Sequence, residues 1–354
     1  MYIKKQEDLC EGKFAEYKDL VNITFGPDVK YIPENCFNSC DKLQEITFQG
    51  NINSVEAAAF MNCDNLQIIN ANNIGIIKDF AFYGCNNIFD FNIKENIGSN
   101  IKYGTNNDIL SQYFIFPEIG ISLNDISWQK LNLISQKNKV KDYFKVGDEK
   151  ELIISEYDYK AYSWINSQMV IKHHPKTIYH IQILGFNHDI ISKTNQKASI
   201  TFGLKEIMET KQTINYTKSN IGGWKHCEMR KYLRHNVFDN LPDKLKFIIK
   251  SVDKLTSKGE ESNEIEITSD KLFLLSESEV FDKIVNSAIG EGNQYQYFIN
   301  GGSKIKYRLG SSYSWWLRSP DVGGKTCFNY INSTPSCNRY AANGFDGVVF
   351  GFCI

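Results

Sequence analysis

Few residues in this chain have both the type and the spacing that catalysis or metal binding requires. Cys327 and Cys337 are ten residues apart on the two sides of an expected hairpin, where they would be able to form a disulfide in an oxidising compartment. His188 and Asp189 are adjacent, and an aspartate can orient an imidazole for proton transfer. The simpler interpretation is that the pair makes hydrogen bonds that hold a turn.

The remaining motifs favour no reaction. His173 and His174 precede Pro175 and point to opposite sides of an extended chain, so we expect them in a solvated loop. The sequence has no G-x-S-x-G element, no phosphate-binding glycine loop, no C-x-x-C pair and no EF-hand calcium loop. We therefore predict a protein without catalytic residues, metal ligands or cofactors.

A polar, turn-rich window between Asp321 and Asp346 is the candidate ligand-binding site. Tyrosine, asparagine and arginine are the adaptable contact residues of antibody-like surfaces. The candidate residues are Tyr330, Asn332, Asn338, Arg339, Tyr340 and Asn343. An ordinary polar hairpin has the same composition, so that alternative stays open.

The segment just before this window contains Trp315, Trp316 and Arg318. Its simpler interpretation is a core tryptophan with an arginine that locks the surrounding strands. The alternative is an aromatic floor beneath a ligand groove.

The elements that must position these residues begin with an N-terminal repeat. Phe37, Phe60 and Phe82 recur at intervals of 23 and 22 residues, and Cys40, Cys63 and Cys85 keep the same intervals. A fixed period in the low twenties is typical of a leucine-rich-repeat solenoid, in which stacked repeats bury a shared core. We expect the phenylalanines in one internal column and the cysteines as small buried residues. Phe14, 23 residues before Phe37, indicates a degenerate capping copy.

This block resembles the BspA-type leucine-rich repeats of bacterial surface proteins. The resemblance rests on IPENCFNSCDKLQEITF (32–48) and AFMNCDNLQII (59–69).

The C-terminal part alternates expected strands and helices. We expect strands at 178–186, 271–275 and the end of the chain, and a helix that Ser276 and Glu279 start with a capping box. The stretch LTSKGEESNEIEITSDK (255–271) reads as an exposed polar excursion. Asn343-Gly344 and Asp346-Gly347 are hairpin signals.

Residues 122–354 resemble a bacterial family of unknown function that often accompanies BspA-type repeats. The resemblance rests on motifs that include ILGFNHD (183–189), NIGGWKHCEMRKYL (220–233), SWWLRSP (314–320) and GVVFGFCI (347–354). That family is similar to the C-type-lectin-like fold of formylglycine-generating enzymes. The enzymes use a close cysteine pair, from which Cys327 and Cys337 depart in spacing. The stretch 155–177 is longer than the simple hairpin that the resemblance implies there.

Composition bounds the remaining possibilities. With 354 residues, two domains are expected. Lys plus Arg (40) nearly equals Asp plus Glu (41), so no basic field favours nucleic acid. No apolar run of 18 residues predicts a membrane span, and no signal peptide is visible. The family resemblance implies a cell-surface or secreted protein, and a cytoplasmic location stays open.

Together these features predict an α+β chain: a leucine-rich-repeat solenoid (1–97), a connector (98–121) and a C-type-lectin-like domain (122–354). The predicted function is non-catalytic recognition of a protein or glycan through the C-terminal domain, the repeat surface or both. The alternatives are an oxidative enzyme of the formylglycine-generating type and a structural module of an envelope or phage-like assembly.

Overall fold

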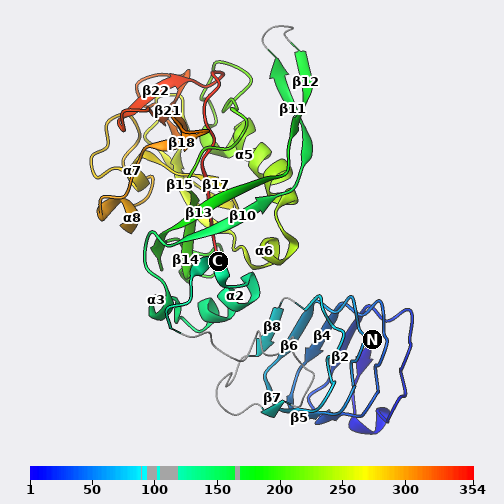
Figure 1. Cartoon of the computed structure of the whole chain (residues 1–354). Helices are drawn as coiled ribbons and strands as arrows, with labels where there is room; N and C mark the ends of the chain where they lie inside the picture. Colours follow the sequence, from blue (N-terminus) through cyan, green and yellow to red (C-terminus); the bar gives the residue numbers. More distant parts are fainter. Residues whose placement is uncertain (89, 94–101, 104–118, 164–167) are drawn as a thin grey trace. The chain divides into compact units, whose positions relative to one another are not determined.

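The computed structural model describes residues 1–88, 90–93, 102–103, 119–163 and 168–354 (Figure 1). The chain divides into two compact units, Met1–Glu118 and Ile119–Ile354. Most of the predicted connector, residues 98–121, lies outside the described residues. Each unit buries its own set of apolar side chains.

The first unit is a solenoid with two parallel sheets, as the repeat predicts (Figure 1). The first sheet contains, in spatial order, β1 (Tyr2–Ile3), β2 (Asn22–Phe25), β4 (Glu45–Phe48), β6 (Ile68–Ala71) and β8 (Asp90–Ile93). The second contains β3 (Tyr31–Ile32), β5 (Asn51–Val55), β7 (Asn73–Ile77) and β9 (Lys102–Tyr103), and a short helix, η1 (Gln6–Asp8), follows β1. Ile23 pairs with Ile46, and Ile46 with Ile69, so the ladder advances by one repeat per strand.

The predicted phenylalanine column is confirmed. The rings of Phe14, Phe37, Phe60 and Phe82 stack in sequence with centroids 5.2, 5.2 and 5.4 Å apart. Phe37, Phe60 and Phe82 have no exposed surface. The stack extends into the degenerate first copy through Phe14, which therefore caps the column as predicted.

A third ladder of hydrogen bonds joins the corners of successive coils. The Phe37 amide donates to the Ala59 carbonyl and the Phe60 amide to the Ala81 carbonyl, both at 2.8 Å. The cysteines are buried, as expected, and they also join the coils: the thiols of Cys63 and Cys85 donate to the carbonyls of Phe37 and Phe60. The repeated cysteine thus supplies a small apolar volume and one hydrogen-bond donor to each coil.

The second unit is mostly sheet, with short helices around it. Its central antiparallel sheet has the order β10 (Glu149–Ile154), β13 (Thr177–Phe186), β14 (Ile200–Leu204), β23 (Phe350–Cys353) and β17 (Phe273–Leu274). The last strand of the chain, β23, lies between β14 and β17, and residues 348–354 are buried. The predicted C-terminal strand is therefore an interior strand of this sheet.

Smaller elements complete the unit. Six strands pair as hairpins: β11 (Tyr157–Ser163) with β12 (Gln168–His174), β15 (Val252–Ser257) with β16 (Ile265–Asp270), and β18 (Lys306–Arg308) with β19 (Ser311–Tyr313). A separate three-stranded sheet has the order β20 (Trp315–Pro320), β21 (Cys327–Ile331) and β22 (Cys337–Ala341). The helices are η2 (Leu123–Asp125), α2 (Trp128–Gln136), α3 (Val140–Tyr143), α4 (Gly223–His226), α5 (Glu228–Tyr232), η3 (Leu233–Val237), η4 (Phe238–Asn240), α6 (Asp243–Ile248), α7 (Glu277–Val280) and α8 (Gln296–Ile299). The capping box of Ser276 and Glu279 at α7 is confirmed.

Two local predictions are wrong. The expected polar excursion at 255–271 contains most of the hairpin β15–β16, and Thr256 and Thr268 on it are buried. Asn343-Gly344 and Asp346-Gly347 do not join a hairpin, because β22 pairs with β21 whereas β23 pairs with β14 and β17. In both places long-range pairing overrides the local signal.

Candidate functional site

An aromatic cluster occupies one face of the sheet β20–β21–β22. Tyr330 on β21 and Tyr340 on β22 lie beside Trp316 of β20, with ring centroids 6.3 and 5.7 Å from the indole. Trp316 is fully buried, and its Nε1 donates to the Gln212 carbonyl at 2.8 Å. Tyr330 is half-buried and 44% of Tyr340 is exposed, so the cluster has a fixed base and a solvent-facing top.

Gly344 allows the Tyr340 ring to lie flat in this place. A Cβ at Gly344 would sit 2.2 Å from Cε1 of Tyr340, closer than any real contact. The glycine after β22 is therefore needed for the ring to settle on Trp316.

The six predicted site residues do not share one face. Successive side chains on a strand alternate, so Tyr330, Asn338 and Tyr340 lie together and Arg339 points to the other side. There the Arg339 guanidinium lies 3.6 Å from the buried Asp321 carboxylate. Asn332 accepts the Ser336 amide and thereby holds the β21–β22 turn.

Asn343 is half-buried in the segment that follows β22. The structure thus brings three of the six candidates together. Ligand contact at all six residues stays a prediction.

The aromatic surface extends beyond the predicted window. Segment 211–216 runs beside 342–346, because Gln212 exchanges backbone hydrogen bonds with Asp346 and the Asn215 amide donates to the Ala342 carbonyl. Tyr216 from this segment lies 6.3 Å from Tyr162 at the end of β11.

Two lysines lie over aromatic rings of the same region. Lys172 on β12 is 5.3 Å from the Phe345 ring centroid, and Lys211 is 4.8 Å from that of Tyr313. Among the described residues neither lysine has a carboxylate at ion-pair distance. We call the set Tyr162, Lys172, Lys211, Tyr216, Tyr313, Tyr330, Tyr340 and Phe345 the tyrosine–lysine surface.

Sequence reasoning missed the part of this surface that comes from β11, β12 and segment 211–216. The hairpin β11–β12 projects from the rest of the second unit in Figure 1. Its unexpected length was the available signal, since 155–177 exceeds a simple hairpin.

The histidines of this hairpin are only partly where the sequence placed them. His173 is exposed and its Nδ1 lies 2.8 Å from Asp158, but His174 is buried and stacks on Tyr157 at 4.7 Å. The expectation of a solvated loop for both is wrong. Alternation along β12 turns the second ring into the unit, where it meets the Tyr179 hydroxyl at 3.0 Å.

A buried ionic network lies among the strands of the second unit. Arg318 pairs with both oxygens of Glu279, at 2.5 and 2.9 Å, and donates to the carbonyls of Leu274 and Glu291. Its side chain has no exposed surface. The interpretation of Arg318 as an arginine that locks the strand cluster is confirmed.

Lys254 continues the network. Its ammonium lies 2.5 Å from Glu279 and 2.7 Å from Asp189, and all three side chains are buried. Burial alone would raise the pKa of Asp189, but the charge of Lys254 holds it well below its usual range. The pKa of Glu279 is likewise lowered, because Arg318 and Lys254 outweigh the cost of burial. The ions are therefore mutually compensated, as buried charges must be.

This network also accounts for the His188–Asp189 pair. The Asp189 carboxylate accepts hydrogen bonds from Thr201 at 2.6 Å, from Lys254 and from the Tyr295 hydroxyl. His188 Nδ1 is 3.6 Å away. Asp189 is thus a structural acceptor and has its hydrogen bonds within the core.

The cysteines Cys327 and Cys337 are at opposite ends of the β21–β22 ladder. Cys327 faces Ala341 and Cys337 faces Ile331, so four residues, or roughly 13 Å of strand, separate them. Disulfides need Cα atoms within about 7 Å. The hypothesis that these two cysteines pair is wrong for this fold, and both are free.

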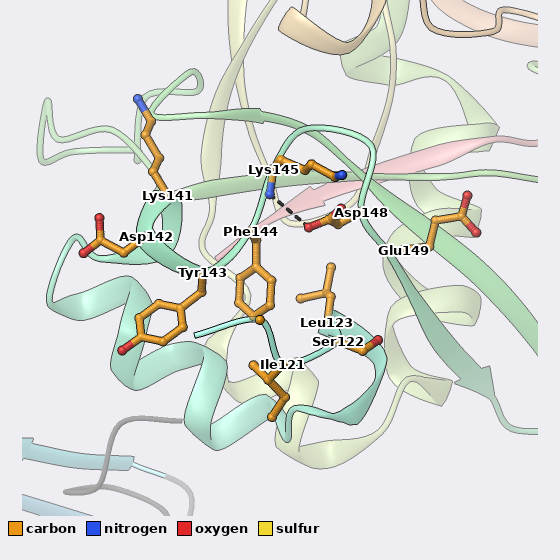
Figure 2. Close-up of a pocket in the computed structure, with 11 residues that line it drawn as sticks. Ile121, Ser122, Leu123, Lys141, Asp142, Tyr143, Phe144, Lys145, Asp148 and Glu149 are labelled. Atoms are coloured by element: carbon orange, nitrogen blue, oxygen red, sulfur yellow. Dashed lines mark hydrogen bonds between the residues drawn. The ribbon is translucent and has the colours of Figure 1, made fainter. Parts of the chain in front are cut away.

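Concave sites occur elsewhere on the second unit. One depression has a volume of ≈ 500 Å³. Its lining includes the apolar side chains of Ile121, Leu123 and Phe144 and the charged side chains of Lys141 and Asp148 (Figure 2). A second pocket, of ≈ 370 Å³, lies where helices α5, η3 and η4 meet the end of β16.

Across the described ranges no group of three His, Cys, Asp or Glu side chains is placed to hold a metal ion. In the same ranges no helix has the length and apolarity to cross a membrane.

Two families match parts of the chain. The BspA type leucine rich repeat region matches residues 7–132 in six copies. A domain of unknown function (DUF6273) matches residues 199–354. No match was found among curated proteins or solved structures. The N-terminal repeats thus belong to a class that often mediates protein binding, and the second unit carries a domain whose role is open.

Proposed function

We propose that this chain is a non-catalytic recognition protein that binds a protein partner through the tyrosine–lysine surface of its second unit. The observation that carries the proposal is the stack of half-exposed Tyr340 on buried Trp316, on a surface where Lys172 and Lys211 lie over aromatic rings. Tyrosines held on a rigid base lose little entropy on binding, and they are enriched at interface hot spots.

The charges of the surface indicate the chemistry of the partner. Lys172 and Lys211 lie over aromatic rings, and among the described residues neither ammonium forms an ion pair, although the charge of Lys211 partly offsets the burial that raises the pKa of Asp346. A partner with exposed carboxylates would supply their counter-charges, which chiefly raises the association rate and the specificity. We therefore propose an acidic protein surface as the ligand. The solenoid offers a second binding face, since stacked repeats build extended surfaces.

The proposal also covers the domain limits, the fold of the second unit and the location of the protein. We propose domain limits of 1–97, 98–121 and 122–354, with a C-type-lectin-like fold in the last, because the family that residues 122–354 resemble is similar to that fold. A cell-surface or secreted location is supported by the BspA-type repeats. The oxidative-enzyme alternative loses its support because Cys327 and Cys337 are too far apart for a reactive pair. A structural module of an envelope assembly remains the competing class.

The full chain on a protein array and a glycan array tests the proposal. Tyr216→Ala/Tyr340→Ala should abolish the strongest protein signals. Tyr83→Ala, which changes an exposed tyrosine of the solenoid, should retain them. Signals confined to the glycan array would show that the partner is a sugar and not a protein. Loss with Tyr83→Ala alone would move the site to the repeats, and full binding by both variants would overturn the proposal.

A further inference from the structure

The pocket of ≈ 370 Å³ on the second unit is independent of the tyrosine–lysine surface. The lining residues that matter for binding are Arg230, Arg234, Phe238, Asp239, Ser251 and Lys271. Its volume is at the lower end of the range for small-molecule sites, which is about 300–1,000 Å³. A bare inorganic ion would leave much of it empty.

One wall of the pocket is a π-helix. The Phe238 amide donates to the Leu233 carbonyl, five residues back, and η3 between them carries Arg234 and His235. π-Helical turns are rare, and they occur frequently at functional sites because the extra residue re-aims side chains. Here the wide turn presents Arg234 and His235 on the exposed side while Leu233 and Val237 stay buried.

The cations of the pocket divide into one that is neutralised and two that are not. The charge of Arg230 is neutralised by Asp270, to which its Nε donates at 2.6 Å. Its other nitrogens donate to the carbonyls of Lys225 and Ser269. Arg234 and Lys271 have no carboxylate at ion-pair distance among the described residues. Asp239 on the rim is the remaining acid, so the free charge is positive.

Lys271 is held in place over an aromatic ring. Its ammonium is 4.6 Å from the Phe238 ring centroid, which fixes the charge beside an apolar wall. Partial burial of its ammonium, together with the nearby Lys250, lowers the pKa of Lys271, although the residue as a whole is exposed. Both effects disfavour the charged ammonium, and an anion beside it would favour the charged form.

We propose that this pocket binds a small organic anion: one carboxylate, phosphate or sulfate group on a body about the size of a monosaccharide. The oxyanion lies between Arg234 and Lys271, and Arg is suited to planar, bidentate recognition of such groups. The Phe238 ring packs on the apolar face of the body, and the Ser251 hydroxyl lies within the same pocket. The site is separate from the proposed protein-binding surface and does not depend on it.

Calorimetric titration of the full chain tests this site with four probes: glucuronate, glucose 6-phosphate, glucose 6-sulfate and neutral glucose. At low ionic strength we expect saturable binding of at least one anionic sugar and none of glucose. The probe that binds most tightly shows whether the pocket prefers a carboxylate, a phosphate or a sulfate. Affinity should fall as salt rises, because a partly exposed ion pair is screened.

Variants place the binding in the pocket. Arg234→Gln and Lys271→Gln should each weaken the preferred anion at least tenfold, and both side chains are exposed, so the fold should persist. Lys244→Gln, an exposed lysine outside the pocket, removes the same charge and should leave affinity unchanged. The proposal is overturned if Arg234→Gln and Lys271→Gln bind the preferred anion as tightly as the wild type does. It is also overturned if neutral glucose binds as tightly as the anionic sugars, or if no anion binds saturably.

Discussion

The phenol ring of Tyr340 lies stacked on the indole of Trp316, with ring centroids 5.7 Å apart and 19° between the planes. Trp316 is fully buried, whereas nearly half of Tyr340 faces solvent. One face of the tyrosine ring thus packs on the indole, and part of the ring faces solvent. A side chain ordered before binding loses less conformational entropy at the interface.

Replacing Tyr340 with alanine should weaken partner binding by about 1–2 kcal/mol, the cost of removing an aromatic anchor. Loss of the stack on Trp316 should destabilise the fold by no more than about 1.5 kcal/mol. Surface plasmon resonance with a partner from the protein array measures the first quantity, and urea denaturation the second.

The matched control is Arg339→Ala, one residue away on the opposite face of β22. Its affinity should equal that of the wild type, although the sequence alone placed Arg339 in the site. If Arg339→Ala costs as much as Tyr340→Ala, the partner does not bind this face of the sheet.

Phe60→Ala should destabilise the solenoid by roughly 3–5 kcal/mol, the range for truncating a buried aromatic. Phe60 is fully buried and stacks on Phe37 and on Phe82. Circular dichroism during denaturation measures the loss. The neighbouring Met61→Ala, at a half-buried position, should cost much less. A loss below about 1 kcal/mol for Phe60→Ala would contradict the stacked column.

The elements that sequence predicted well are those in which local and long-range preferences agree. The capping box at Ser276 and the apolar strand at the C-terminus are local signals that the core also uses. The hairpin β15–β16 was missed because Lys254 and Thr256 point inward while Leu255 is half-exposed, which inverts the usual pattern. Those buried polar residues serve the ionic network, whose members are far apart in sequence.

The candidate site shows the same limit. Tyr340 could be recognised from the composition of its window. Tyr162 and Tyr216 could not, because they are 54 positions apart in the sequence and only the fold brings their rings together. Without the strand register, the sequence could not separate the face of Arg339 from that of Tyr340.

Removing residues 347–354 should prevent the second unit from folding, because β23 lies between β14 and β17 in the central sheet. All five tryptophans lie after residue 118, so tryptophan fluorescence monitors the second unit without contribution from the first. We expect a red-shifted spectrum with no cooperative urea transition. A native-like spectrum with a cooperative transition would show that β23 is dispensable.

Thiol titration of the native protein should give one fast-reacting cysteine, Cys10, which is exposed. Cys327 and Cys337 are half-buried, and burial raises the pKa of Cys337, which suppresses its thiolate. Cys10→Ser should abolish the fast phase. Two fast thiols remaining in Cys10→Ser would revive the oxidative-enzyme alternative.

Glu291 should make the second unit less stable as pH rises from about 4.5 to 7. Its side chain has no exposed surface, and burial raises its pKa from the ordinary 4.5 to about 7. In that window the unfolded chain releases the proton while the folded chain keeps it, so the unfolded state binds fewer protons and stability falls. A shift of this size corresponds to roughly 3 kcal/mol, at about 1.4 kcal/mol for each pKa unit.

The variant Glu291→Gln isolates this effect, because the amide has the shape of the protonated acid and does not titrate. Urea denaturation followed by tryptophan fluorescence at several pH values should show a smaller loss of stability from pH 4.5 to 7 in the variant. Below that window both proteins should lose stability as pH falls, because the lowered pKa values of Asp189 and Glu279 oppose their protonation in the fold. Glu156→Gln, at an exposed position, should follow the wild-type curve. If the curves of wild type and Glu291→Gln stay parallel from pH 4.5 to 7, Glu291 is ionised in the folded protein and the ionic network carries an additional negative charge.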